Sequence, residues 1–252
     1  SITDDFERFI YSPTNADDAK LNSNFVNCIL TDGMHIWIGT ESGGINKLTP
    51  KRLFLQNYRH NRENPSSLSY NPVNAVYEDK DGNLWVGTVE GGLNLKKKSR
   101  GCEQFIHYTS ERDEISHNSV SCITTDNKNR LWIGTWGLGI NIMDLKEPYR
   151  VQEIMFMDPD TNFMFYFIAT LIYDPINNGM WIGADIGLFF YDLTTHKISL
   201  PFADAENIRN CLGSIIDKEE KLWIGCSKGV YIIDLRSYSA QPEKGKFRYR
   251  HL

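Results

Sequence analysis

The chain has 252 residues, of which 41% are hydrophobic, 23% charged and 12% aromatic, and its formal net charge is −5. The length suits one large domain, and the composition is that of a soluble globular protein with an aromatic-rich interior. The acidic balance argues against a nucleic-acid partner, because general nucleic-acid binders carry a basic surplus. No apolar run reaches the roughly 20 residues that span a bilayer, so we expect no direct membrane insertion of this chain.

A five-residue motif recurs along the chain at intervals of about 47 residues. Each copy has an aliphatic residue, a tryptophan, a second aliphatic residue, a glycine and a small residue. The copies are Ile36–Thr40, Leu84–Thr88, Leu131–Thr135, Met180–Ala184 and Leu222–Cys226. Self-similarity at a fixed period of this size is the signature of a repeat architecture.

Each motif lies among other short apolar strands. An apolar run that ends in an acidic turn precedes it, as in Val73–Asp79, and a short strand follows a small or glycine-bearing turn, as in Leu93–Leu95. A further strand, such as Phe54–Tyr58, completes most copies, and helical periodicity is absent throughout. A four-stranded unit cannot bury both of its faces alone, but radial stacking of such units buries them. We therefore predict an all-β fold, a β-propeller built of four-stranded antiparallel blades.

The period defines about five complete blades and one incomplete one. The predicted blades span 24–58, 71–108, 118–156, 166–202 and 212–251. An orphan outer strand at 6–11 matches the fourth strand Phe105–Tyr108, so its own first three strands are missing. Either this strand completes the last blade and closes a five-bladed ring, or the chain is an open arc within a larger array. We favour the open arc, which would expose apolar sheet faces and cause self-association.

The segment Asp79–Asn94 reads Asp-x-x-Gly-x-Leu-Trp-Val-Gly-Thr-x-x-Gly-Gly-Leu-Asn and resembles the two-component regulator propeller repeat. The copies at Ile36–Asn46 and Leu131–Asn141 keep the core of this pattern, and the last two copies lack the double glycine. The resemblance implies the periplasmic sensor region of a bacterial hybrid two-component protein, often one that responds to oligosaccharides. It also implies a seven-bladed parent propeller with other propeller or sandwich domains as partners.

Candidate binding residues lie in the turns and connections on one face of the blades. Trp136 replaces the Glu41, Val89, Asp185 and Ser227 of the sister copies, and an exposed tryptophan there could stack on a sugar ring. The alternative is that Trp136 packs on a neighbouring blade or domain. The same face is expected to carry Arg59, His60, Arg62, Arg112 and Arg209, which either bind carboxylate or sulfate groups or are simply solvated loop charges.

The sequence predicts no catalytic residue, no cofactor and no metal site. Its histidines lack ligand spacing, and the five cysteines follow no disulfide or metal pattern. Cys28 and Cys122 stand at equivalent places in two first strands, where small residues fit, so we expect structural cysteines and no disulfide among the five. The leading hypothesis is a binding protein and not an enzyme. The alternatives are a carbohydrate-active propeller enzyme, such as a lyase or glycosidase with axial carboxylates, and a purely structural interaction platform.

Overall fold

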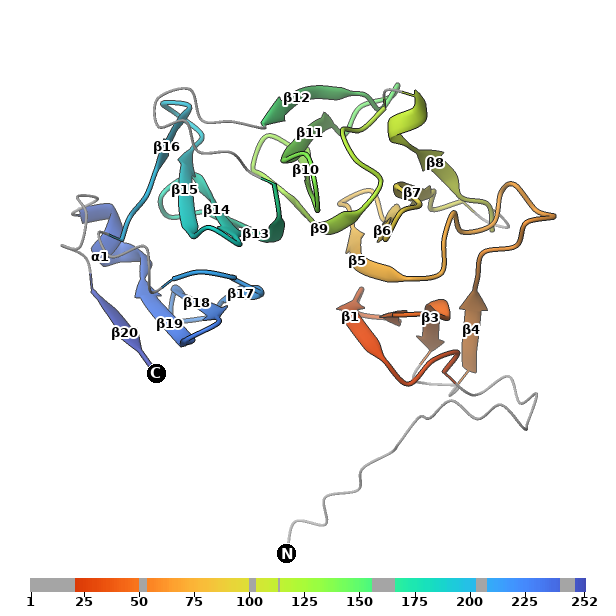
Figure 1. Ribbon diagram of the computed structural model, residues 1–252, viewed down its shortest axis with the longest axis horizontal. Helices are drawn as coiled ribbons and strands as arrows, with labels where there is room; N and C mark the ends of the chain where they lie inside the picture. Colours follow the sequence, from red (N-terminus) through yellow and green to blue (C-terminus); the bar gives the residue numbers. More distant parts are fainter. Residues whose placement is uncertain are drawn as a thin grey trace, which may run out of the picture. The chain divides into compact units, whose positions relative to one another are not determined.

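The computed structural model describes residues 21–49, 54–99, 103–112, 114–155, 166–202, 208–240 and 248–252. The chain divides into two compact units, Ser1–His107 and Tyr108–Leu252. Within them lie five four-stranded antiparallel sheets, the blades of a β-propeller, and this confirms the predicted fold class (Figure 1). The orphan strand predicted at 6–11 lies outside the described residues.

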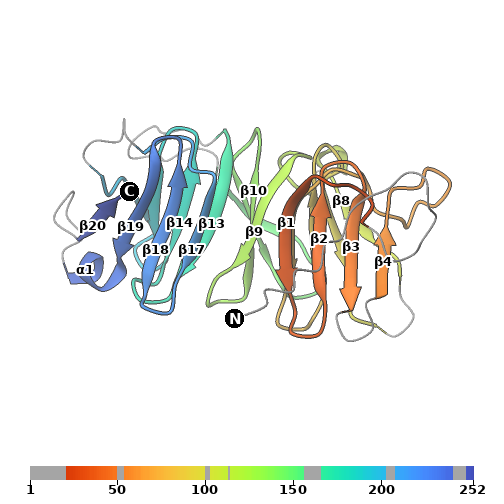
Figure 2. The ribbon, with the colours of Figure 1, turned by 90° about the horizontal axis from the view of Figure 1, so that it is seen from below.

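The first unit holds two blades, numbered here in chain order. Blade 1 consists of β1 (Val26–Thr31), β2 (Ile36–Thr40), β3 (Gly44–Thr49) and β4 (Phe54–Tyr58). Blade 2 consists of β5 (Val73–Glu78), β6 (Leu84–Thr88), β7 (Leu93–Lys96) and β8 (Ile106–Tyr108), whose last residue begins the second unit. Figure 2 shows the strands of blade 1 side by side in chain order, which is the meander that the repeat predicts.

The second unit holds three blades. Blade 3 follows a short 3-10 turn, η2 (Ser110–Arg112), and consists of β9 (Val120–Thr125), β10 (Arg130–Thr135), β11 (Ile140–Asp144) and β12 (Val151–Met155). Blade 4 consists of β13 (Ile168–Asp174), β14 (Gly179–Ala184), β15 (Leu188–Asp192) and β16 (Lys197–Ser199). Blade 5 consists of β17 (Gly213–Ile216), β18 (Lys221–Cys226), β19 (Gly229–Asp234) and β20 (Tyr249–His251), with α1 (Leu235–Ala240) inserted before its last strand.

The motif tryptophans fill the space between successive blades of a unit. Trp37 packs with Val73 and Leu84 of the next blade, and Trp132 packs with Leu171 and Tyr191. Trp181 packs in the same way against the strands of blade 5. A tryptophan ring removes a large apolar area from water at this position, so within each unit these three rings tie a blade to the following one.

The motif glycine is required because the next blade comes close to it. A Cβ built on Gly39 would lie 2.7 Å from the Val73 side chain, and one built on Gly134 would lie 2.7 Å from Ile168. Both approaches are too short for any other residue. Glycine therefore lets the first strand of one blade pack directly on the second strand of the blade before it.

The helix α1 is a feature that the sequence pattern did not predict. It has six residues, too few for stability on its own, and it follows β19 directly. Its Tyr238 ring lies 5.0 Å from the ring of Trp181 and 5.1 Å from that of Phe190. Packing on these two rings of blade 4, together with the cap in which the Ser237 amide donates to Asp234 Oδ1 at 3.1 Å, accounts for the helical turn.

Candidate functional site

A buried or half-buried carboxylate anchors the tryptophan in every blade. In each copy an aspartate from the turn after the first strand accepts a hydrogen bond from the indole Nε1. The pairs are Asp32–Trp37 (3.1 Å), Asp79–Trp85 (2.9 Å), Asp126–Trp132 (2.9 Å), Asp174–Trp181 (3.0 Å) and Asp217–Trp223 (2.7 Å). The second oxygen accepts backbone amides of the same turn, as Asp79 does from Asp81 and Asn83. The acidic turns of the repeat are therefore structural.

The pKa of two of these carboxyl groups follows from the same contacts. Burial works to raise the pKa of Asp32, but the amides of His35 and Met34 and the rings of His35 and Trp37 outweigh it and lower the pKa to about 2. The indole of Trp223, with two turn amides, lowers the pKa of Asp217. These groups are thus ionised at neutral pH, which suits a hydrogen-bond acceptor and not a general acid.

The opposite end of the first three blades carries a second polar anchor. The buried Asn94 of β7 donates to Ser69 Oγ at 2.8 Å and accepts the Ser69 amide at 2.9 Å. Asn141 makes the same two bonds with Ser116, and Asn46 is bonded to Asn22. These bonds hold the connection that enters a blade against the third strand of that blade.

Blades 4 and 5 replace this asparagine by an aromatic residue. Phe189 and Tyr231 stand directly after the first residue of the apolar third-strand run, where the earlier blades have asparagine, and both are buried. The last two blades thus use apolar packing where the first three use a hydrogen-bond network. Their departure from the repeat sequence has this physical basis.

The turn between the second and third strands is held by its main chain in all five copies. The residue after the motif donates its amide to a carbonyl of the segment that enters the blade. The bonds are Glu41–Phe25 (3.0 Å), Val89–Pro72 (3.0 Å), Trp136–Ser119 (2.9 Å), Asp185–Phe167 (3.2 Å) and Ser227–Arg209 (3.2 Å). The amide makes this bond whatever the side chain is, although in blade 5 the Ser227 hydroxyl also donates to the Arg209 carbonyl at 3.1 Å. The side chain is therefore free to differ between blades.

Trp136 uses this freedom and forms part of an exposed apolar patch in the second unit. We define the loop patch as Trp136, Leu138, Tyr166, Phe167 and Ile186, each of which is 36–52% exposed. The main chain connects them: Trp136 pairs with Phe167 in an isolated bridge, and the Gly137 amide donates to the Tyr166 carbonyl at 2.6 Å. These main-chain contacts bring the turn of Trp136 and the segment of Tyr166 and Phe167 together at the surface between blades 3 and 4. Grouped exposed apolar side chains of this kind commonly mark a binding surface.

The sequence left open whether Trp136 is exposed to a ligand or packs on a neighbouring blade or domain, and its exposed fraction lies between these two cases. Its side chain is 41% exposed, whereas Trp85, Trp132 and Trp181 are fully buried. It therefore packs partly on its neighbours and still offers ring surface to a ligand. Tyr166 and Phe167 are candidates that the sequence did not reveal, because they lie in the connection between blades and outside the repeat motif.

The four predicted arginines are exposed and His60 is half-buried, and together they do not form one cluster within either unit. Arg59 and Arg62 lie in the connection between blades 1 and 2, and both are exposed. His60 lies between them, but its Nδ1 is bonded to the Leu68 carbonyl at 2.9 Å and its amide to Asn71 at 2.8 Å. These bonds give His60 a structural role in the connection.

Arg112 and Arg209 are exposed in the second unit. Arg112 is the last residue of η2, which precedes the connection to β9. Main-chain hydrogen bonds connect the segment of Arg209 to the loop patch. The amide of Asn210 donates to the carbonyl of Asp185, and the amide of Asp185 donates to the carbonyl of Phe167. A cationic side chain therefore lies along the edge that carries the exposed aromatic rings.

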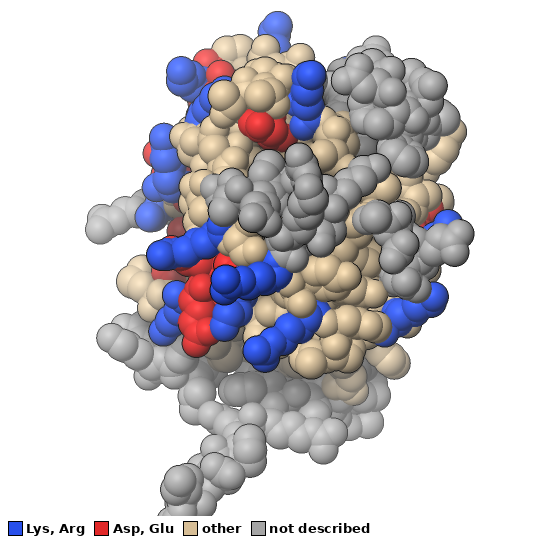
Figure 3. All heavy atoms as spheres, turned by 90° about the vertical axis from the view of Figure 1, so that its left-hand side faces the viewer, with Lys and Arg blue, Asp and Glu red and all other residues tan. Residues whose placement is uncertain are grey.

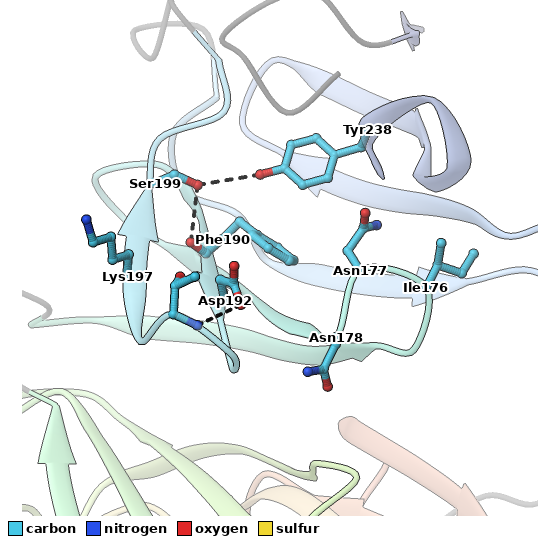
Figure 4. Close-up of a pocket in the computed structure, with 9 residues that line it drawn as sticks. Ile176, Asn177, Asn178, Phe190, Asp192, Lys197, Ser199 and Tyr238 are labelled. Atoms are coloured by element: carbon cyan, nitrogen blue, oxygen red, sulfur yellow. Dashed lines mark hydrogen bonds between the residues drawn. The ribbon is translucent and has the colours of Figure 1, made fainter. Parts of the chain in front are cut away.

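A cavity of about 400 Å³ opens between blades 4 and 5, beside α1 (Figure 4). Asp192, Lys197 and Tyr238 are among its lining residues. Ser199 Oγ bonds to the Phe190 carbonyl at 3.4 Å and lies 3.5 Å from the Tyr238 hydroxyl. The Ser199 hydroxyl thus has the Phe190 carbonyl and the Tyr238 hydroxyl as neighbours, and the cavity is a polar pocket.

The outer face of blade 5 is rich in charge. Figure 3 shows lysine and arginine side chains around a few carboxylates on this side of the molecule. A hollow of about 350 Å³ there is lined by Lys221, Trp223, Ile232, Asp234, Arg248, Tyr249 and Arg250.

Among the described residues no group of three or more histidine, cysteine or acidic side chains could hold a metal ion. No helix in the described part of the chain is long and apolar enough to cross a membrane.

Three segments of the chain, 20–42, 67–90 and 114–137, match the family model of the two component regulator propeller. They cover the first two strands of blades 1, 2 and 3, the blades that keep the buried asparagine. No curated protein matches the sequence.

Among solved structures, the fold resembles the extracellular domain of BT3049 from B. thetaiotaomicron, described as a hybrid two component system, with a TM-score of 0.76 and 21% identity over 96% of this chain. The extracellular domain of BT4673 from the same organism gives a TM-score of 0.70 and 20% identity over 91% of this chain. A streptogramin B lyase gives 0.61 and 15% identity over 92% of this chain and 70% of that chain. These likenesses show the propeller fold. The chain spans 30% of the first of these proteins and 31% of the second.

Proposed function

Since three of its blades carry the repeats of the two-component regulator propeller family, we propose that the chain is part of the sensor region of a bacterial hybrid two-component signalling protein. In this proposal the chain lies on the periplasmic side and binds an oligosaccharide without transforming it. Ligand binding favours one arrangement of the parent protein and so changes the signal that the parent transmits.

The observation that carries the binding proposal is the loop patch. Sugar rings present apolar C–H faces that stack on aromatic side chains, and Trp136 and Phe167 offer such surfaces on backbone that is fixed by hydrogen bonds. Arg209 on the same edge could pair with a carboxylate or sulfate group of an acidic sugar. The turn carboxylates of the repeat are all engaged with indole and amide groups, which supports binding without catalysis.

A titration of the chain with an oligosaccharide library tests the proposal. Tryptophan fluorescence is a suitable signal, because Trp136 is the most exposed tryptophan of the described residues. We expect a hit whose affinity falls at least tenfold in Trp136→Ala. The matched control is Met34→Ala, which removes an exposed apolar side chain from the first unit. Equal affinities of wild type and Trp136→Ala would refute the loop patch as the site, and turnover of the hit would favour an enzyme.

We also propose that further blades or domains of the parent protein cover the outer sheet faces of this chain. The first unit exposes Phe25 and Ile29 beside β2, and the second exposes Leu212 and Ile215 beside β18. Apolar side chains at these first-strand positions favour a protein partner over water. The isolated chain should therefore self-associate. In sedimentation velocity, Ile29→Lys and Ile215→Lys should both reduce this association, and a wild type that is monomeric at high concentration would contradict it.

A further inference from the structure

Blade 5 brings two cysteines together at positions that no other blade fills with cysteine. Cys226 directly follows Gly225, as Thr40, Thr88, Thr135 and Ala184 follow the glycine in the other motifs. Cys211 stands two residues before Gly213, which pairs with Gly225. In the first four blades the residues at these two positions are cross-strand partners: Val26–Thr40, Val73–Thr88, Val120–Thr135 and Ile168–Ala184.

The two sulfur atoms are in contact. Cys211 Sγ lies 3.4 Å from Cys226 Sγ. Antiparallel cross-strand neighbours have Cα atoms about 4.5–5.5 Å apart, which is inside the range of about 4.4–6.8 Å that a disulfide bridges. A bond of about 2.0 Å between the sulfur atoms therefore requires only a small side-chain movement.

The main chain on both sides of the pair is fixed. The Leu212 amide donates to the Gly225 carbonyl at 2.8 Å, and the Cys211 amide donates to the Ala184 carbonyl at 3.2 Å. On the other side the Ser227 amide donates to the Arg209 carbonyl. The fold thus holds the two thiols in contact before any oxidation, which favours a specific bond.

From this juxtaposition we propose that Cys211 and Cys226 form a reversible cross-strand disulfide that links the entrance of β17 to the end of β18. The bond closes the loop of residues 212–225 and fastens the first two strands of blade 5, whose outer face is exposed. This inference goes beyond ligand sensing and does not depend on it.

The two thiols differ in the way that dithiol–disulfide exchange requires. Cys226 is partly exposed, and the hydrogen bond from the Cys211 thiol lowers its pKa. The same bond and burial raise the pKa of the fully buried Cys211. Cys226 is therefore the thiolate that meets an oxidant, and Cys211 is the resolving thiol. By contrast, burial raises the pKa of both Cys28 and Cys122 to about 12.

The oxidant is a small-molecule disulfide or the disulfide of an oxidoreductase. The Cys226 thiolate attacks one sulfur of this disulfide, forms a mixed disulfide and expels the other sulfur as a thiolate. The Cys211 thiol then loses its proton and attacks Cys226 Sγ, which expels the second thiolate. Cys211 and Cys226 together lose two protons and two electrons, and the oxidant becomes two thiols.

The experiment uses the reduced chain, treated with excess oxidised glutathione, alkylated in denaturant and digested with trypsin. Cleavage after Arg209, Lys218, Lys221 and Lys228 places the two cysteines in separate peptides, 210–218 and 222–228. We expect these peptides to be joined and two hydrogens lighter than their sum. Cys28, Cys102 and Cys122 should carry the alkyl label.

The matched control is the double variant Cys211→Val/Cys226→Thr, which installs the residue pair of blades 2 and 3 and should give no joined peptide. Oxidation of the wild type in urea serves as a second control that needs no variant, and it should give mixed pairings. Three results would each overturn the proposal. One is that both cysteines carry the alkyl label after the wild type has been oxidised in its folded state, and another is a persistent glutathione adduct on Cys226. The third is the same yield of joined peptides after oxidation in urea as after oxidation of the folded chain.

Discussion

The substitution Asp79→Asn tests whether the turn carboxylate is the anchor of its blade. Asp79 is 5% exposed, and its Oδ2 accepts hydrogen bonds from Trp85 Nε1 at 2.9 Å and Asn83 Nδ2 at 3.0 Å. Its Oδ1 accepts the amides of Asp81 and Asn83. Asparagine can keep the two amide bonds through its carbonyl oxygen, but its NH2 group then faces two donors.

The expected loss follows from the two bonds that asparagine cannot make. A hydrogen bond to a charged acceptor contributes about 1.5–3 kcal/mol, and a buried donor without a partner costs about 1–3 kcal/mol. Trp85 is fully buried, so water cannot replace the carboxylate at its Nε1. Asn83 can turn its amide toward another partner. We therefore expect Asp79→Asn to lower the free energy of unfolding by about 2–4 kcal/mol.

Urea unfolding followed by circular dichroism measures this change. Asp217→Asn is the matched control, because Asp217 and Trp223 make the same bond in a more exposed turn where water can substitute, and its loss should be smaller. Trp85→Phe completes a double-mutant cycle that should show a coupling of about 1–2 kcal/mol with Asp79→Asn. A stability change for Asp79→Asn below about 0.5 kcal/mol would refute the reasoning, because that is the range of inert surface substitutions.

Four further predictions concern single contacts. Trp85→Ala should lower the free energy of unfolding by about 3–5 kcal/mol in a denaturant melt, because a fully buried ring leaves a cavity. Trp136→Ala should cost about 1 kcal/mol or less in the same melt, since its ring is 41% exposed and its amide bond survives. Asn94→Ala should cost about 2–3 kcal/mol, because it leaves the Ser69 amide without its partner. The folded protein lowers the pKa of Asp32 to about 2 from 3.8, so the stability that its ionised carboxyl group contributes is complete above about pH 4 and is lost as the pH falls toward 2. The difference in free energy of unfolding between wild type and Asp32→Asn should therefore shrink over that range.

The blades were predictable because period, motif and turn chemistry agree along the chain. The tryptophan, the glycine and the acidic turn of each copy give the same strand order that the sheets show. The partnership of Asp79 with Trp85 was not predictable in this way, since it depends on how the turn folds back over the second strand. The helix α1 was missed because it depends on Tyr238 packing on another blade as well as on the local Asp234 cap, and the repeat pattern encodes neither.

The sequence predicted only part of the candidate site, for a related reason. Trp136 could be found because it differs from its four sister residues in a repeat that aligns them. Tyr166 and Phe167 lie in a connection outside the five-residue motif, where the equivalent residues of other blades, such as Pro72 and Ser119, share no pattern, and the pairing of Phe167 with Trp136 reveals them. Cys211 likewise lies before its strand and outside the motif, so its contact with Cys226 became visible only in the structure.

The way the turns are held explains where such a repeat protein can acquire function. Glu41, Val89, Trp136, Asp185 and Ser227 differ in charge, size and polarity, yet each makes the same amide-to-carbonyl bond. Since the main chain supplies the bond, substitution of the side chain leaves the turn intact. The tryptophan, aspartate and glycine of the motif have no such freedom, because each is fixed by burial, a hydrogen bond or a close approach. Exchange of Trp136 for Val, the residue of blade 2, should therefore preserve the fold in circular dichroism while removing the aromatic surface that the proposed ligand needs. Loss of the folded spectrum in Trp136→Val would show that the side chain, and not only the main chain, holds this turn.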